Sequence, residues 1–86
     1  MKLKSGLLLR QVAGENVVLA MGGEVNLKGM LTLNDTGVTL WKCLENGAEK
    51  SDLVAALLAE YDVDEQTATE HVALFVGKLE KHGLTE

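Results

Sequence analysis

The chain has 86 residues, one cysteine and a formal net charge of −5, and 47% of its residues are hydrophobic. This composition excludes a disordered tail, and the acidic charge disfavours a phosphate-backbone ligand, which requires a positive surface. No apolar run approaches the roughly 18 residues that span a bilayer, and no cleavage-site pattern follows the apolar stretch near Met1. We therefore expect one cytoplasmic domain over residues 1–86, with no membrane segment, no nucleic-acid ligand, and a protein or peptide as its partner.

The first third of the chain predicts a β-sheet. Apolar runs at residues 7–12 and 17–21 are separated by Ala13-Gly14-Glu15-Asn16, whose Gly and Asn tolerate positive φ, so the two runs are expected to form a hairpin. Gly22-Gly23 ends the second run. Residues 25–33 then alternate with a period of two, which is typical of a half-buried strand. One face of that strand is expected to carry Val25, Leu27, Leu31 and Leu33.

The remainder predicts three helices. The first spans residues 35–45, with Asn34 or Asp35 as its cap, and Gly47 is expected to end it in the left-handed conformation. The second covers roughly residues 49–61 and should bury Leu53, Leu57 and Leu58.

The third helix should start after Asp64, a good N-cap, and close at Gly83. Its buried stripe is predicted to consist of Ala68, Val72, Phe75 and Leu79, with Val76 at the margin. The expected fold class is therefore α+β: a three-stranded antiparallel sheet followed by three helices, with a winged-helix-like outline.

A recognisable motif joins the sheet to the helices. Leu33-Asn34-Asp35-Thr36-Gly37 is followed by Trp41 and Leu44, and later by Tyr61-Asp62-Val63. The last helix then carries, in order, Ala68, Val72, Phe75, Val76, Leu79, Gly83 and Leu84. This pattern resembles the pyrroloquinoline quinone biosynthesis protein D (PqqD) family, also called the recognition elements for ribosomally made, post-translationally modified peptides. One departure is His71, where the family usually carries Asp, so any role of that carboxylate does not transfer.

The resemblance implies a non-catalytic peptide chaperone. Such a protein binds the leader segment of a precursor peptide and presents it to a modifying enzyme, commonly of the radical S-adenosylmethionine class. The leader is implied to add as a strand in the groove between the third strand and the third helix. The residues placed at that groove are Lys28, Met30, Leu31, Thr32 and Leu33 on the strand, and Thr67, His71, Leu74, Phe75 and Lys78 on the helix.

Several of these residues, Thr32 among them, also have a purely structural interpretation. Leu74 is either an apolar contact for the peptide or an ordinary surface leucine, and Lys78 is a candidate for attracting acidic leader residues. Met30 is an adaptable contact or an exposed strand residue, and Lys28 is a groove residue or an edge charge that discourages aggregation. Phe75 is expected to serve the core more than the ligand, as are Trp41 and Leu79.

Catalytic and metal sites are not predicted. Cys43 has no histidine near it in sequence, and one cysteine with His71 and His82 offers too few ligands for structural zinc. The loop from Asp62 lacks the glycine and glutamate that a calcium loop needs. We therefore expect no enzyme activity, cofactor or metal.

Two other functional classes share part of this pattern. A winged-helix DNA-binding regulator would have the same outline, but its recognition helix should carry basic or amide side chains, whereas this one begins Asp64-Glu65. A carrier-type protein would use Ser51, but its motif has serine after aspartate and its fold is all-helical. The sequence leaves open the precursor peptide and its pathway (pyrroloquinoline quinone synthesis included), the enzyme, and whether the chain is a monomer or a homodimer.

Overall fold

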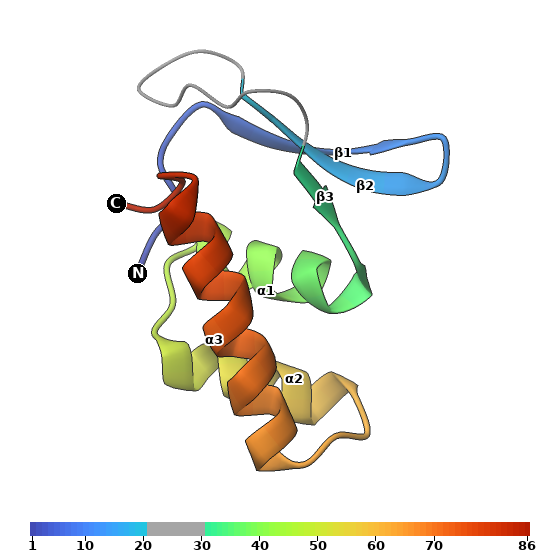
Figure 1. The fold of residues 1–86 in the computed structure, drawn as a ribbon, viewed down its shortest axis with the longest axis vertical. Coiled ribbons are helices and arrows are strands. Elements are labelled where there is room, and N and C mark those ends of the chain that lie inside the picture. Colours follow the sequence, from blue (N-terminus) through green and yellow to red (C-terminus); the bar gives the residue numbers. More distant parts are fainter. Residues whose placement is uncertain (21–30) are drawn as a thin grey trace.

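Three strands form the sheet of the computed structural model, which describes residues 1–20 and 31–86. They are β1 (Leu7–Val12), β2 (Glu15–Ala20) and β3 (Leu31–Leu33), paired antiparallel in the order β1-β2-β3 (Figure 1). Strand β3 is therefore an edge strand of the sheet that residues 1–20 and 31–86 form. The described sheet confirms the predicted topology and rules out the all-helical fold of a carrier protein.

The turn between β1 and β2 is shorter than predicted. Val12 pairs with Glu15, so Ala13 and Gly14 alone make the turn, with φ of 52° and 81°. Positive φ at both positions defines a type I′ turn, whose twist matches that of the flanking strands. Glu15 and Asn16, both expected in the turn, are consequently the first residues of β2, because the strand twist selects the two-residue connection.

The described part of β3 confirms the period of two. Leu31 and Leu33 are 7% and 5% exposed, whereas Thr32 between them is exposed. The predicted strand began at residue 25, and its earlier part, including Val25 and Leu27, lies outside the described residues. The groove predictions for Lys28 and Met30 also fall there.

The first two helices follow their predicted boundaries closely. Helix α1 (Asp35–Glu45) is capped by the Asn34 side chain, whose Oδ1 accepts a hydrogen bond from the Gly37 N–H at 2.9 Å. Gly47 follows its C-cap with φ of 81°, as expected of a left-handed residue at this position. Helix α2 (Lys50–Glu60) begins with a reciprocal capping box between Glu49 and Asp52.

Helix α3 (Glu65–Lys81) is the longest element and is capped at both ends. Asp64 accepts a hydrogen bond from the Thr67 N–H at 2.7 Å. This backbone bond, together with the Thr67 side chain, lowers the pKa of the Asp64 carboxyl. At the other end, Gly83 adopts φ of 69°, and the N–H groups of Gly83 and Leu84 donate to the carbonyls of Glu80 and Leu79, the Schellman arrangement.

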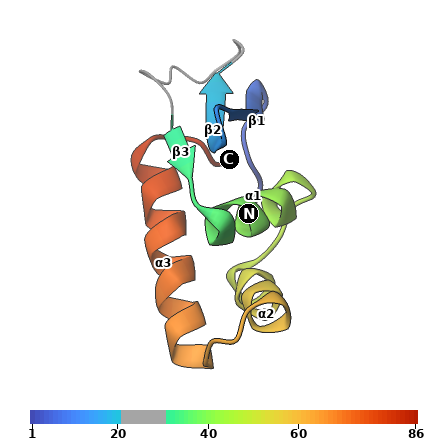
Figure 2. The ribbon, with the colours of Figure 1, turned by 90° about the vertical axis from the view of Figure 1, so that its right-hand side faces the viewer.

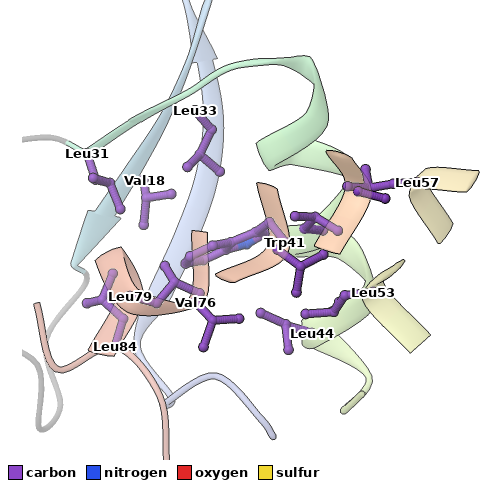
Figure 3. Packing of buried hydrophobic residues seen from close by; sticks show 13 residues of the cluster. Val18, Leu31, Leu33, Trp41, Leu44, Leu53, Leu57, Val76, Leu79 and Leu84 are labelled. Carbon is purple, nitrogen blue, oxygen red and sulfur yellow. The ribbon is translucent and has the colours of Figure 1, made fainter. Parts of the chain in front are cut away.

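One apolar cluster joins the sheet to all three helices (Figure 3). Trp41 is 1% exposed and lies in the middle of the cluster, between residues of the sheet and of α3. The other cluster residues labelled in the figure are Val18, Leu31, Leu33, Leu44, Leu53, Leu57, Val76, Leu79 and Leu84. Burial of Trp41, Leu53 and Leu57 confirms their predicted core positions.

Three core predictions require correction. Val76, predicted at the margin, is 1% exposed, whereas Phe75, predicted within the buried stripe, is only half-buried. The buried positions of α3 are centred roughly 55° from Phe75 around the helix, so this ring lies at the edge of the core face. Leu58 is 41% exposed rather than buried, because α2 packs through the face that carries Leu53 and Leu57.

The two ends of the chain are held together, as Figure 1 shows. The Lys4 N–H donates to the Leu84 carbonyl at 2.9 Å, and the Glu86 N–H donates to the Lys2 carbonyl at 2.8 Å. The Met1 carbonyl accepts from Ala48 in the loop between α1 and α2. In the part of the chain that the structure describes, every helix is too short or too polar to cross a membrane.

Candidate peptide-binding groove

An open groove of about 510 Å³ lies between β3 with the start of α1 on one side and α3 on the other. Figure 2 shows β3 descending into the first turn of α1 while α3 rises past them. The residues that line the groove are Thr32, Leu33, Asn34, Thr36, Gly37, Leu40, His71, Leu74, Phe75 and Lys78. Its walls therefore come from two segments far apart in sequence.

The strand wall of the groove carries backbone groups without strand partners. Strand β3 pairs with β2 along one edge, and no strand within residues 1–20 and 31–86 pairs with its other edge. In an antiparallel pair, successive residues alternate between bonding the partner strand and pointing away from it. At least one residue of β3 therefore directs its N–H and C=O away from β2, on the side of the groove.

The first turn of α1 packs tightly at the bottom of this wall. A Cβ built on Gly37 would lie 3.3 Å from the Leu33 Cβ and 3.5 Å from the Phe75 Cε1. It would also lie 3.2 Å from the Asn34 Oδ1 that caps the helix. These contacts give a physical reason for a small residue after Leu33-Asn34-Asp35-Thr36, because a larger one would push α1 away from β3 and α3.

The helix wall is apolar in the middle and basic at one end. Leu74 is 73% exposed, although it is a large apolar side chain, and half-buried Phe75 lies beside it. His71 and Lys78 lie about one helical turn before and after them, and both are exposed. Lys78 is the only Lys, Arg, Asp or Glu side chain among the described residues that line the groove.

The structure brings together six of the ten residues that the sequence placed at the groove. Thr32, Leu33, His71, Leu74, Phe75 and Lys78 all line it. Whether they bind a peptide stays a prediction.

Of the other four residues, the structure places two away from the groove. Leu31 belongs to β3 but directs its side chain into the core. Thr67 does not line the groove: it sits in the first turn of α3, bonded to the Asp64 cap, about one turn before His71. Lys28 and Met30 lie outside the described residues.

Sequence reasoning missed the contribution of α1. Asn34, Thr36, Gly37 and Leu40 line the groove, although the sequence predicts Asn34 only as a cap and Thr36 and Gly37 only as part of a motif. Their position in the sequence could have indicated this role, because they directly follow a strand whose edge is expected to receive the peptide. Tertiary packing of α1 against Phe75 then places them on the same wall.

The residues considered for other chemistry do not assemble into a site. Cys43 is half-buried with a free thiol and packs against the core. Among residues 1–20 and 31–86, no three His, Cys, Asp or Glu side chains gather closely enough to hold a metal ion.

These features define a small α+β domain with an open strand edge beside a partly apolar helix. Residues 15–84 match the family model described as coenzyme PQQ synthesis protein D (PqqD), and the chain belongs to this family. A search of curated proteins found no match.

Two solved structures resemble the whole chain. TbiB1, solved in complex with the TbiA(beta) leader peptide, is 27% identical with a TM-score of 0.78, and the match covers 100% of this chain and 95% of that one. Lasso peptide synthetase B1, complexed with the leader peptide, is 24% identical with a TM-score of 0.74 over 96% of this chain and 93% of that one. At 24% identity, the likeness to lasso peptide synthetase B1 supports the fold alone.

Proposed function

We propose that this protein binds the leader segment of a ribosomally made precursor peptide and presents it to a modifying enzyme, without catalysing a reaction itself. The observation that carries the proposal is the groove in which the open edge of β3 faces the exposed Leu74 of α3. Membership in the PqqD family supports it, as does the likeness to TbiB1, which was solved with a leader peptide. The enzyme is proposed to be of the radical S-adenosylmethionine class or another peptide-modifying class.

Strand addition is the binding mode that fits this groove. A peptide laid along β3 in extended form would pair with the outward backbone groups of that strand, and its side chains would alternate toward and away from α3. Backbone pairing accepts many sequences, so selectivity would come from the side chains that reach Leu74 and Phe75.

Magnitudes indicate that both contributions are needed. A strand of three residues offers about two to four hydrogen bonds, each contributing roughly 0.5–1.5 kcal/mol. Association itself costs at least about 4 kcal/mol, so these bonds alone cannot give the roughly −8 kcal/mol of a micromolar complex. Burying one or two apolar peptide side chains, at about 1.5–3 kcal/mol each, helps to close the difference.

The test uses the leader of a short precursor encoded beside the gene of this protein, labelled with fluorescein and titrated by anisotropy. We expect a dissociation constant on the order of micromolar or tighter. A proline in the centre of the bound segment should weaken binding at least about tenfold, because it removes a ladder N–H, whereas a proline outside the segment should not. Equal affinity for both proline variants would contradict strand addition.

The presenting role needs a second readout. The neighbouring enzyme should modify the precursor faster when this protein is added, and the Leu74→Lys variant, which places a charge in the groove, should not accelerate it. If the variant accelerates the modification as much as the natural protein does, the acceleration does not depend on peptide binding in the groove.

A further inference from the structure

We infer that the groove selects leader peptides in which an apolar residue is followed two positions later by aspartate or glutamate, with the carboxylate meeting Lys78. The inference rests on the proposed function and specifies its substrate class. It follows from three properties of the groove: its charge, the spacing of its helix residues and the relative direction of β3 and α3.

The charge of the groove is opposite to that of the molecule. The chain carries a net charge of −5, yet the described lining residues include Lys78 and no Asp or Glu. The ion pair found within residues 1–20 and 31–86 joins the Met1 amino group to Glu49, so Lys78 has no acidic partner there. A peptide carboxylate would supply that partner, and a basic peptide would be repelled at the same place.

The spacing of the helix wall matches that of an extended peptide. Lys78 follows Leu74 by four residues and Phe75 by three, which corresponds to about 4.5–6 Å along the helix axis. Side chains on the same side of a strand are two residues apart, or roughly 6.6 Å. A peptide side chain that packs on Leu74 and Phe75 therefore places the side chain two positions away next to Lys78.

The direction of the strands sets the order of the two residues. Strand β3 and helix α3 run in roughly opposite directions in both views (Figures 1 and 2). All pairs in this sheet are antiparallel, and antiparallel pairing is slightly more stable per residue, so an added strand is expected to run against β3. Such a peptide runs with α3, from His71 toward Lys78, and its acidic residue lies on the C-terminal side of the apolar one.

The experiment is an affinity selection of random twelve-residue peptides, displayed on phage, against the natural chain and the variants Lys78→Glu and Lys81→Glu; the enriched peptides are then tested for binding to Leu74→Lys. Lys78→Glu reverses the charge of the groove. Lys81→Glu changes the net charge equally on the same exposed end of α3 but lies outside the groove, so it serves as the matched control. Both side chains are exposed, and circular dichroism should verify that both variants fold.

The natural chain and Lys81→Glu should enrich peptides with an apolar residue followed two positions later by Asp or Glu. Lys78→Glu should lose this preference and favour Lys or Arg at the same position. For a synthetic winning peptide, replacing the carboxylate by its amide should weaken binding to the natural chain about fivefold, and should leave binding to Lys78→Glu unchanged or stronger.

Three outcomes would overturn the inference. If enriched peptides carry no acidic preference, yet lose binding to Leu74→Lys, the groove binds peptides without charge selection and the proposed function stands. If Lys81→Glu shifts the selection as much as Lys78→Glu, the effect is net charge rather than a contact in the groove. If no peptide is enriched and the neighbouring precursor's leader also fails to bind, the proposed function is wrong, and the inference is wrong with it.

Discussion

Helix α3 has two faces that differ in exposure and, by our account, in purpose. On one face, Ala68, Val72, Val76 and Leu79 are no more than 2% exposed and pack into the core. On the adjacent flank, Leu74 is 73% exposed, although it is the same type of residue as Leu79. The contrast teaches that the hydrophobicity of a residue does not determine its role; its angular position relative to the sheet does.

Phe75 lies at the boundary between these faces. It packs against the core cluster, lines the groove, and lies 3.5 Å from where a Cβ on Gly37 would sit. The ring therefore supports the wall that a peptide would touch. This position explains why sequence periodicity assigned Phe75 to the core while the family resemblance placed it at the binding site.

The largest effect is expected from Leu79→Ala on the core face. Removing this fully buried side chain should lower the free energy of unfolding by about 2–5 kcal/mol, because the cavity is only partly refilled. Urea denaturation followed by circular dichroism would measure the change. A decrease in the free energy of unfolding of less than about 0.5 kcal/mol would show that this face of α3 does not pack into the core.

The same substitution on the other face should separate binding from stability. Leu74→Ala should change the free energy of unfolding by less than about 0.5 kcal/mol, because the side chain is exposed. It should weaken leader binding about tenfold, since it removes an apolar contact of roughly 1.5 kcal/mol. Anisotropy titration against Leu58→Ala, another exposed leucine outside the groove, provides the control.

Gly77→Ala tests the solvent-exposed side of α3, where a substitution should affect stability without touching the core or the groove. Gly77 lies inside the helix, and a Cβ built on it meets no atom within 4 Å. Alanine there should raise the free energy of unfolding by about 0.5–1 kcal/mol, because it restricts the unfolded chain and favours the helix. Thermal denaturation would detect the increase, and a decrease would indicate that the helix is more crowded at this position than the structure shows.

The smallest effect concerns the start of α3 and depends on pH. Hydrogen bonds from Thr67 lower the pKa of Asp64 in the folded state, so the ionised cap stabilises the fold above the ordinary Asp pKa. That stabilisation is lost as the pH falls through the lowered pKa of the folded protein. Asp64→Asn keeps a capping side chain and should flatten this part of the melting temperature profile.

The matched control is Asp62→Asn, which removes an equal charge two residues earlier from an exposed position. Its melting temperature should retain the natural dependence on pH in the acid range. If both variants flatten the profile equally, general charge rather than the cap is responsible.

Local chemistry explains which parts of the fold were predictable. Caps such as Asn34, Asp64 and Gly83 act within a few residues of themselves, so their side chains and conformational freedom suffice to locate the helix ends. The alternation of Leu31, Thr32 and Leu33 similarly needs only the pleat of a strand. These features hold in the structure.

Features that depend on tertiary packing were not predictable in the same way. Ala13 adopts positive φ because strand twist requires it, although alanine itself disfavours that conformation. The exchange of Val76 and Phe75 reflects where the sheet lies relative to α3, and a helical period alone does not fix that angle. The groove wall formed by Thr36, Gly37 and Leu40 depends on the packing of α1 against Phe75.

We propose that a leader peptide adds to the open edge of β3 beside α3. This mode of binding is tested most directly by an NMR titration of the isotope-labelled protein with the unlabelled leader of a neighbouring precursor. Strand addition predicts saturable amide shifts concentrated at residues 31–37 and 71–78, with slowed hydrogen exchange at the outward amides of β3. Saturable shifts centred on the outer surface of α2 or on β1, with β3 unaffected, would contradict it.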